Sequence, residues 1–417
     1  MNILISHVFG AWNKGDWILL QEIIRLIKDS FPNAEISGIS RDPELQERIF
    51  KDVTWYQRLD TSFHKRKLFR MIQVTVGILN ILSLSTFYST LKCLNITPPS
   101  FLGLREIYDA DLIVMCPGGY WDSTKKSFIS NLINLQALIF CQKYNRIIWA
   151  PQSIEKIDNQ LLEWKFKELL NHASIAFLRE SFSFKYVQSL NLTEVICQLT
   201  PDLAFYYQPD LNSLDDSIIN KYLSKPEDKF VACTALEWHF PNSNDLKKSH
   251  KNYVEALAQS SIYMAEKYDI KTLLVRQIGD SEDGKGDIKV LYEIQKLSEG
   301  NAIVVEEDLT PDELSSLISK AEYLIGSRMH SNIFALLSGT PVIAVSYQKK
   351  TDGIMKMMEL EDYLISIDDV SMRDIKYIAE TILENRNQLS EYVKGKVDNL
   401  KKEREQIIEK FREICSI

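Results

Sequence analysis

The sequence predicts an α/β fold with two Rossmann-like domains facing a cleft. The chain has 417 residues, of which 45% are hydrophobic and 25% are charged. It is therefore too long for one ordinary core and too apolar to be disordered. Strand-like apolar runs alternate with helix-like segments through most of its length, as they do in parallel βαβ units. A polar stretch near the middle of the chain separates two series of such runs.

The first series of apolar runs predicts an N-terminal domain over residues 1–206. Segments of helical periodicity follow the runs, which indicates strands joined by helices. We expect a helical insertion at about 60–105 within this domain. The predicted strands are 3–6, 34–39, 112–115, 147–150 and 175–178.

The second series predicts a C-terminal domain over residues 230–372. Pro, Asp and Ser cluster between the two series, so residues 207–229 are predicted to be a linker. In the last part of the chain, 373–417, Glu and Lys are interspersed as on solvated helices. The predicted strands of the second domain are 230–234, 272–275, 302–305, 323–325 and 342–346.

Charge and cysteine usage exclude several classes of protein. The formal charge of −8 and the pI near 5.5 argue against nucleic-acid binding, which depends on clustered Lys and Arg. The six cysteines lie far apart without a C-x-x-C pair, so neither a zinc knuckle nor a disulfide framework is indicated. Metal-ligand spacing is also missing, and we predict no metal dependence. The N-terminus enters a strand pattern at once, without the basic region of a secretory signal, and a cytoplasmic location is expected.

The segment 323–350 is the most informative part of the chain. Its apolar strand ends at Gly326, and Ser327 is predicted to cap a helix that stops at Gly339. Arg328 and His330 are then expected in the first helical turn. Because that turn follows a parallel strand, both lie at the sheet edge where open α/β folds bind ligands.

These two side chains suit an anionic substrate. Backbone N–H groups at a helix start attract anions, and the Arg328 guanidinium matches a phosphate or a carboxylate. His330 adds a proton donor or acceptor near neutral pH. Phosphoenolpyruvate carries both anionic groups, so this pair would suit it. The alternative is a surface arginine with a structural histidine.

The same segment resembles the C-terminal signature of the polysaccharide pyruvyl transferase family. That signature is an R-[LM]-H core, a helix, a G-x-P-V strand and an S-Y-x-x-K turn. The resemblance implies a GT-B-like glycosyltransferase architecture, with Arg328 and His330 at the site for phosphoenolpyruvate and no cofactor besides this donor substrate. The matching positions are Arg328, Met329, His330, Gly339, Pro341, Val342, Ser346, Tyr347 and Lys350.

Two further blocks near the N-terminus resemble the family. The segment FGAWNKGDWILL is similar to an N-x-G-D turn formed by Asn13, Gly15 and Asp16, in which glycine permits the turn and Asp16 can cap the next helix. The segment DLIVMCPGGYWDS resembles a strand with a glycine-rich loop, although Cys116 and Pro117 replace glycines. There, Gly118 and Gly119 let the backbone approach a ligand, and Tyr120 and Trp121 are candidates to stack on a sugar. Both blocks have a purely structural turn as the alternative.

Two blocks complete the first domain. The segment IIWAPQSIEK resembles a G-Q-S-I-G-P loop and retains Gln152 and Ser153. The strand ending in R-[DE]-x-x-S places Arg179 at the sheet edge, where we expect it to join Arg328 around phosphoenolpyruvate. A surface pair between Arg179 and Glu180 is the alternative. Two acidic residues, Asp202 and Asp287, are further candidates for the site. His239 is predicted to lie in a loop, where it can face the cleft or solvent.

Residues 64–91 combine a basic cluster with a run from Met71 to Leu91 that carries no charge. Its frequent Ser, Thr, Gln and Asn argue against a membrane span. A peripheral contact with the inner face of the membrane is one interpretation, because family acceptors are commonly lipid-linked glycans. A buried helix is the other.

The resemblance implies that the protein moves pyruvate from phosphoenolpyruvate onto a sugar or a lipid-linked oligosaccharide. His330 and Arg328 are the predicted catalytic residues. We predict that substrate is bound by Arg179, Asn13, Asp16, Gly118, Gly119, Gln152, Ser153 and Lys350. Two alternatives stay open, a nucleotide-sugar glycosyltransferase of the same architecture and a binding protein that has lost turnover.

Overall fold

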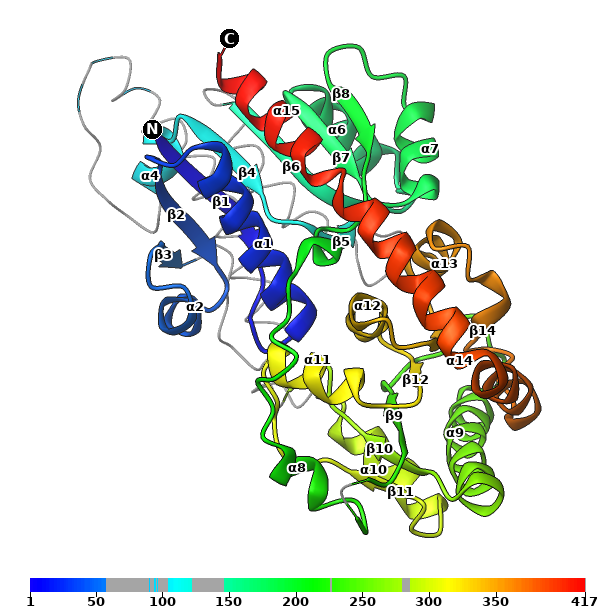
Figure 1. Ribbon diagram of the computed structural model, residues 1–417. Helices are drawn as coiled ribbons and strands as arrows, with labels where there is room; N and C mark the ends of the chain where they lie inside the picture. The colour runs from blue at the N-terminus through cyan, green and yellow to red at the C-terminus, as the bar shows by residue number, and fades with distance from the viewer. Residues whose placement is uncertain are drawn as a thin grey trace, which may run out of the picture. The chain divides into compact units, whose positions relative to one another are not determined.

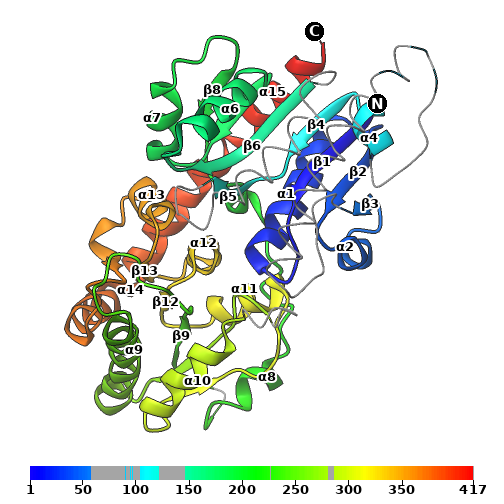
Figure 2. The same cartoon turned by 180° about the vertical axis from the view of Figure 1, so that it is seen from behind.

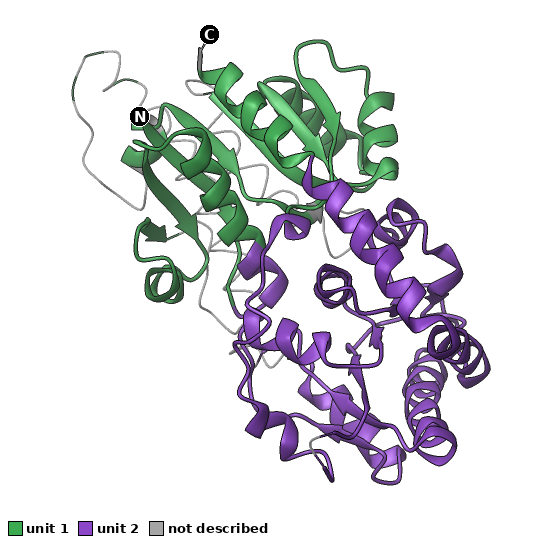
Figure 3. Ribbon diagram, in the orientation of Figure 1, with its two compact units in different colours: residues 1–11, 19–203, 403–417 green, residues 12–18, 204–402 purple. Residues whose placement is uncertain are grey.

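The chain divides into two α/β units, shown in different colours in Figure 3. Figure 1 shows the computed structural model, which describes residues 1–57, 90, 94, 96, 104–121, 146–225, 227–279 and 286–416. Unit 1 consists of residues 1–11, 19–203 and 403–417, and unit 2 of residues 12–18 and 204–402. Each unit has its own parallel sheet, and helices connect many of its strands (Figure 1, Figure 2).

The sheet of unit 1 has the strand order β3-β2-β1-β4-β6-β7-β8, and β5 pairs with β6. All of these pairings are parallel. The five strands predicted for this domain are confirmed, and β3, β5 and β8 are additional. The strands are β1 (Asn2–Val8), β2 (Glu35–Ser40), β3 (Thr54–Gln57), β4 (Leu112–Met115), β5 (Gly118–Trp121), β6 (Arg146–Ile154), β7 (Ile175–Leu178) and β8 (Ile196–Leu199).

Strand β7 shows how the core of unit 1 is built on both faces of the sheet. Successive side chains of a strand point to opposite faces. Leu178 joins the apolar cluster that includes Phe166 of α6, whereas Phe177 stacks on Phe411 of α15 with 6.1 Å between ring centroids. The helices of this unit are α1 (Lys14–Ser30, with its first residues in unit 2), α2 (Pro43–Ile49), α4 (Leu104–Asp109), α6 (Gln160–Asn171), α7 (Ser181–Ser189) and α15 (Arg404–Ser416).

The sheet of unit 2 has the order β11-β10-β9-β12-β13-β14, and all its pairings are parallel. The chain leaves β9 toward β10 on one side and later adds β12 on the other. The strand order therefore reverses between β9 and β12, the position where open sheets bind ligands. The predicted strands are confirmed and β14 is additional: β9 (Phe230–Thr234), β10 (Lys271–Leu274), β11 (Ala302–Val304), β12 (Leu324–Gly326), β13 (Val342–Ser346) and β14 (Leu364–Ser366).

Some helices of unit 2 begin with clear capping signals. Thr310 and Glu313 form a capping box at α11, with Pro311 as its first residue. Helix α9 packs against α10 and α14, and α12 packs against α11 and α14. The helices are α8 (Asp216–Asn220), α9 (Leu246–Tyr268), α10 (Ile288–Leu297), α11 (Pro311–Ser319), α12 (Met329–Ser338), α13 (Lys349–Met357) and α14 (Met372–Lys401), with short 3₁₀ turns at Leu203–Tyr206 and Glu361–Tyr363.

The division of the chain differs from the predicted linear one. The units change at 203/204, and the predicted linker belongs to unit 2, where Tyr207 is buried and donates to Asp312 Oδ1 at 2.5 Å. The predicted C-terminal helices are divided, with α14 in unit 2 and α15 in unit 1. Short-range patterns locate elements, whereas unit membership depends on contacts between distant segments.

The predicted insertion at 60–105 and the membrane contact at 64–91 lie almost entirely outside the described residues. No helix in the described part of the chain combines the length and the apolar character that a membrane span requires.

Candidate functional site

The turn between β12 and α12 holds the predicted catalytic residues. Arg328 is the N-cap residue of α12 and has extended backbone angles, and His330 lies in the first turn. Gly339, with φ 75°, ends the helix as predicted. The prediction of Ser327 as the cap is wrong, because its Oγ accepts from Tyr253 Oη at 2.8 Å. The Arg328 side chain makes no capping hydrogen bond to this turn, and the start of a helix favours an anion.

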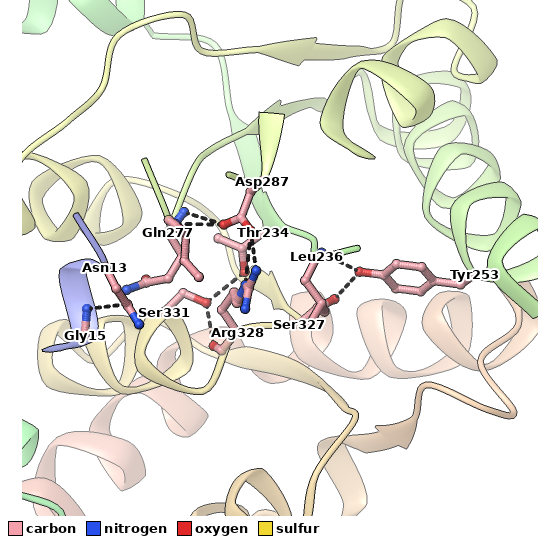
Figure 4. A network of polar contacts seen from close by, with 11 residues as sticks. Asn13, Gly15, Thr234, Leu236, Tyr253, Gln277, Asp287, Ser327, Arg328 and Ser331 are labelled. Carbon is pink, nitrogen blue, oxygen red and sulfur yellow. Dashed lines mark hydrogen bonds and ion pairs between the residues drawn. The ribbon is translucent and has the colours of Figure 1, made fainter. Parts of the chain in front are cut away.

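Arg328 is held by the buried carboxylate of Asp287 (Figure 4). Its Nη2 and Nε donate to Asp287 Oδ1 at 2.5 and 3.2 Å, and Asp287 Oδ2 accepts from the backbone N–H of Gln277 and Ile278 at 3.1 and 2.8 Å. Asp287 is 0% exposed, whereas the Arg328 side chain is 17% exposed. Burial alone would lower the pKa of Arg328, but Asp287 raises it above its ordinary value. The guanidinium thus stays charged and fixed in orientation.

Tyr347, the first residue after β13, lies between two cations. The Arg328 charge acts on its hydroxyl group, and Lys350 Nζ is 5.7 Å from the centroid of its ring. Burial would raise the pKa of Tyr347, but the Lys350 and Arg328 charges together lower it. The phenol ring also packs against Trp238, at 4.7 Å between ring centroids. The S-Y-x-x-K turn therefore contributes a polarised hydroxyl as well as a cation.

Hydroxyl groups join β9 to the start of α12. Ser331 Oγ donates to the Arg328 carbonyl at 2.7 Å and lies 2.8 Å from Thr234 Oγ1. Ser327 N donates to the Thr234 carbonyl at 3.1 Å. These bonds lie at the point where the strand order reverses, and they fix the backbone that carries Arg328 (Figure 4).

The N-terminal turn belongs to the same site in unit 2. Asn13 Oδ1 accepts from Gly15 N at 3.0 Å, and its Nδ2 donates to Asp16 Oδ2 at 3.0 Å. Asn13, and not Asp16 as predicted, therefore caps α1. A Cβ on Gly15 would lie 2.0 Å from His330 Nδ1, so the glycine allows the imidazole to approach the backbone.

The loop after β10 holds this turn in place. Asn13 pairs with Ile278 in an antiparallel bridge, and Lys14 N donates to the Gln277 carbonyl at 3.3 Å. Lys14 Nζ lies 2.7 Å from Asp308 Oδ1, and the lysine side chain is only 4% exposed. Sequence reasoning missed Lys14 and Gln277. Lys14 occupies the variable position of the N-x-G-D turn, and no motif marks Gln277.

Arg179 lies in a buried polar cluster of unit 1. Its Nε donates to Ser153 Oγ at 2.6 Å and to Glu180 Oε1 at 3.0 Å, and its Nη1 donates to Asp202 Oδ2 at 2.6 Å. Arg179 is 1% exposed, so the alternative of a surface ion pair is wrong. Asp202 and Glu180 already occupy the guanidinium, although burial raises the pKa of Glu180 despite the arginine. The expectation of an open cation at the sheet edge is therefore corrected.

The remaining predicted residues of unit 1 surround this cluster. Gly118 and Gly119 form part of β5, and Gln152 and Ser153 lie within β6 and not in a loop. A Cβ on Gly119 would lie 3.0 Å from Arg179 Nη2, so the glycine admits the guanidinium. Gln152 Nε2 donates to the Cys116 carbonyl at 2.7 Å, and Ser153 Oγ donates to Glu180 Oε1 at 2.5 Å.

Trp121 is not available to a sugar. It is 1% exposed and stacks on Trp149 at 5.5 Å between ring centroids, which corrects its predicted role. The Tyr120 side chain lies outside the described part. His239 is exposed beside Trp238, at 4.2 Å between ring centroids. Among the described residues, no group of three or more His, Cys, Asp and Glu is arranged to hold a metal ion.

Comparisons of sequence place the chain among enzymes of polysaccharide synthesis. The profile of the family described as "Polysaccharide pyruvyl transferase" matches residues 13–349. The amylovoran biosynthesis protein AmsJ of Erwinia amylovora is 23% identical over 415 residues, which cover 95% of this chain and 96% of AmsJ.

Solved structures share the architecture at low sequence identity. The UDP-GlcNAc 2-epimerase of Neisseria meningitidis bound to UDP-GlcNAc matches with a TM-score of 0.56 and 12% identity, covering 98% of this chain and 99% of its own. Anabaena Alr3699/HepE in complex with UDP and glucose matches with a TM-score of 0.57 and 13% identity, and the match covers 98% of this chain and 99% of its own. The trehalose-6-phosphate synthase OtsA matches with a TM-score of 0.59 and 10% identity, and the match covers 100% of this chain and 99% of its own. The fold is therefore of the GT-B type.

Proposed function

Because the chain belongs to the polysaccharide pyruvyl transferase family, we propose that it moves pyruvate from phosphoenolpyruvate onto a hexose to form a pyruvate ketal. The acceptor is a sugar such as galactose in a lipid-linked precursor of a surface polysaccharide. The observation that carries the proposal is the charged Arg328 at the start of α12, held by the buried Asp287, with His330 in the first turn of the same helix.

Arg328 binds an anionic group of the donor in this proposal. Asp287 fixes the guanidinium from the buried side, and the exposed part of the fork faces the ligand. The N–H groups of the first turn of α12 add partial positive charge at the same place. Lys350 supplies a second cation near Tyr347. Together they stabilise the charge that builds up as phosphate leaves.

The reaction requires two proton transfers that balance. C3 of phosphoenolpyruvate takes a proton, C2 becomes electrophilic, and one sugar oxygen adds to it. The C2–O bond to phosphate then breaks and a second sugar oxygen adds, which closes the ketal. The two hydroxyl protons replace the one delivered to C3 and the one that leaves with phosphate. His330 is the proposed acid/base group, and its ring is positioned by the close approach of Gly15.

The proposed acceptor contacts include the polar residues of unit 1. Gly118 and Gly119 offer backbone atoms, while Ser153, Gln152 and Arg179 hold these strands from inside the unit. Asn13 and Asp16 are proposed substrate contacts of unit 2. We further propose that the reaction takes place at the cytoplasmic face of the membrane, where phosphoenolpyruvate and a lipid-linked acceptor would meet.

A nucleotide-sugar glycosyltransferase is the second candidate, favoured by the likeness to structures solved with UDP or UDP-sugars. Thermal unfolding in the presence of phosphoenolpyruvate or of a panel of UDP-sugars separates the two functions. We expect phosphoenolpyruvate to raise the unfolding midpoint. Stabilisation by UDP-sugars alone would refute the pyruvyl transferase proposal.

Catalysis is tested with phosphoenolpyruvate and methyl hexosides. The expected product is a hexoside whose mass has increased by one pyruvate ketal, detected by mass spectrometry. Release of phosphate without a sugar does not count as transfer, because hydrolysis of the donor gives the same signal.

A further inference from the structure

Gln277 carries a buried amide group that the fold leaves unpaired. The residue is 2% exposed, and among the described residues neither Oε1 nor Nε2 has a hydrogen-bond partner. Its backbone is fully engaged, because N donates to Asp287 Oδ2 at 3.1 Å and the carbonyl accepts from Lys14 N at 3.3 Å. The main chain is thus anchored, while the side chain has two polar atoms to offer.

Two other buried glutamines, Gln46 and Gln152, leave only Oε1 without a partner among the described residues. Gln46 donates its Nε2 to the Phe9 carbonyl at 3.0 Å, and Gln152 donates to Cys116. Asn332 also has two unpaired amide atoms, but it is packed on β12, where a Cβ on Gly326 would lie 1.7 Å from its Oδ1. Gln277 follows the end of a strand. An unpaired buried amide destabilises the fold, and a ligand that pairs with it accounts for its presence.

The position of Gln277 links it to the donor site. It follows β10 at the carboxyl edge of the sheet and shares Asp287 with Arg328 (Figure 4). On its other side it is bonded to the turn that contains Asn13 and Gly15, and Gly15 contacts His330. A molecule that meets this amide is therefore close to the groups proposed to act on phosphoenolpyruvate.

The chemistry of the amide selects between the two substrates. Phosphoenolpyruvate at neutral pH offers only acceptor oxygens, which can pair with Nε2 but leave Oε1 facing negative charge. A sugar hydroxyl both donates and accepts. Two hydroxyls of one sugar can therefore satisfy Oε1 and Nε2 together.

We infer that Gln277 binds the acceptor sugar through the pair of hydroxyls that become the ketal oxygens. This inference rests on the proposed function. Oε1 accepts from one hydroxyl and Nε2 donates to the oxygen of the other, which orients both toward C2 of the donor. Gln277 takes up no proton itself, so it sets the affinity and identity of the acceptor and leaves the chemistry to other groups.

The test compares Gln277→Met with Gln46→Met in the full-length protein. Methionine has a similar length and lacks the amide, and Gln46 is a buried glutamine outside the site. Wild type is first assayed with phosphoenolpyruvate and the methyl glycosides of galactose, glucose and mannose, and the best of these is used throughout. We expect Gln277→Met to raise the KM for the glycoside by about tenfold or more and to leave the KM for phosphoenolpyruvate unchanged. Gln46→Met should change neither KM.

Two kinetic outcomes would overturn the inference. One is an unchanged KM for the glycoside in Gln277→Met. The other is a raised KM for phosphoenolpyruvate alone, which would assign the amide to the donor.

A stability measurement separates this inference from the proposed function. Gln277→Met removes two unpaired polar atoms, so the unfolding midpoint without ligand should stay equal or rise, whereas Gln46→Met breaks a hydrogen bond and should lower it. If no glycoside accepts pyruvate from wild type, the failure belongs to the proposed function. An unfolding midpoint lowered as much in Gln277→Met as in Gln46→Met would then overturn the inference, because the amide would be paired in the free protein.

Discussion

Gly15 and His330 are set so closely that a single methyl group decides the position of the imidazole. A Cβ at Gly15 would lie 2.0 Å from Nδ1 and 2.5 Å from Cγ of the ring. Real Cβ atoms do not approach other heavy atoms so closely, so the ring would have to move. The residue is thus required for geometry, although it carries no functional group itself.

Gly15→Ala should therefore lower kcat by about tenfold or more while affecting the KM for phosphoenolpyruvate less, because it displaces the proposed acid/base group. Steady-state kinetics measure both constants. Gly395→Ala is the matched control, since nothing lies within 4 Å of a Cβ there. That helix substitution should stabilise the protein by roughly 0.5–1 kcal/mol without changing kcat. An unaltered kcat in Gly15→Ala would contradict the assigned contact.

Arg328 combines a binding role with a structural one. Arg328→Ala should weaken phosphoenolpyruvate binding by about 100-fold, measured by calorimetry, because a charge-assisted fork is lost. It should also lower the unfolding midpoint, since Asp287 is 0% exposed and loses its cation. Adding Asp287→Asn to the variant should restore stability but not affinity. Recovery of affinity in the double variant would show that the guanidinium does not contact the donor.

Lys350 lowers the pKa of Tyr347, and its neighbour Lys349 provides a control. The pKa of Tyr347 is lowered chiefly by the Lys350 cation, followed by Arg328, against the opposing effect of burial. Lys350→Ala should raise the pKa of this phenol, which NMR titration of ¹³C-labelled tyrosine measures. Lys349 is exposed, so Lys349→Ala should leave the titration unchanged. Equal titrations in all three proteins would remove Lys350 from this contact.

At the scale of elements, the packing of α15 on α1 buries a carboxyl group. Arg404 Nη2 of α15 donates to Asp29 Oδ2 at 2.5 Å. Arg412 donates to the backbone carbonyls of Asp29 and Ser30 at 2.7 and 3.4 Å. Glu22 of α1 is only 2% exposed. Its burial outweighs Arg25 and Arg404 and raises its pKa to about 7. The helix pair therefore favours a protonated glutamic acid.

This raised pKa predicts a specific pH dependence of stability. Between pH 4.5 and about 7 the folded state holds a proton that the unfolded state has released, so the free energy of unfolding should fall as pH rises. Above about pH 7 the free energy of unfolding no longer changes through Glu22, and the stability lost by then is about 3 kcal/mol at most. Glu22→Gln should abolish the slope and stabilise the protein most at pH 8, as denaturant titrations would measure. Exposed Glu405→Gln should keep the wild-type slope, and the same slope in Glu22→Gln would contradict the burial argument.

The elements themselves follow from local sequence to a large extent. Apolar runs such as Leu112–Met115 and Phe230–Thr234 are confirmed as strands because each is a short buried segment between polar ones. Strands β3 and β8 were missed, since their side chains are mostly half-buried or exposed and lack that contrast. The loop resemblance around Pro151 predicts a turn there, yet β6 continues through this position.

At the scale of the whole molecule, sequence reasoning failed where distant segments meet. His330 lies in the first turn of α12 as predicted and Gly339 ends the helix, because strand, helix and glycine lie within one segment, whereas Arg328 and not Ser327 is the N-cap residue. Arg328 is paired with Asp287 and Arg179 with Asp202, and no local pattern encodes either contact. Gln277 carries no motif at all, and only its lack of partners in the folded structure marks it.

The assignment of residues 12–18 to unit 2 predicts the response of the chain to its donor. Phosphoenolpyruvate should slow amide hydrogen exchange in 12–18 together with 327–331, because both segments border His330. Strand β8 of unit 1 serves as the internal reference and should exchange at the same rate. Protection of 327–331 without 12–18 would contradict the shared site.

Unit 2 includes residues 12–18 from the first part of the chain, and unit 1 includes residues 403–417 from the last part. This arrangement has a consequence for synthesis and for inheritance. A ribosome releases residues 12–18 long before the strands they join, and it releases helix α15 of unit 1 only after all of unit 2. Unit 1 can therefore assemble with this helix only after the strands of unit 2 have been synthesised. A recombination event that replaced one half at a single crossover would leave both halves with a foreign fragment, so the gene is expected to evolve as an undivided whole.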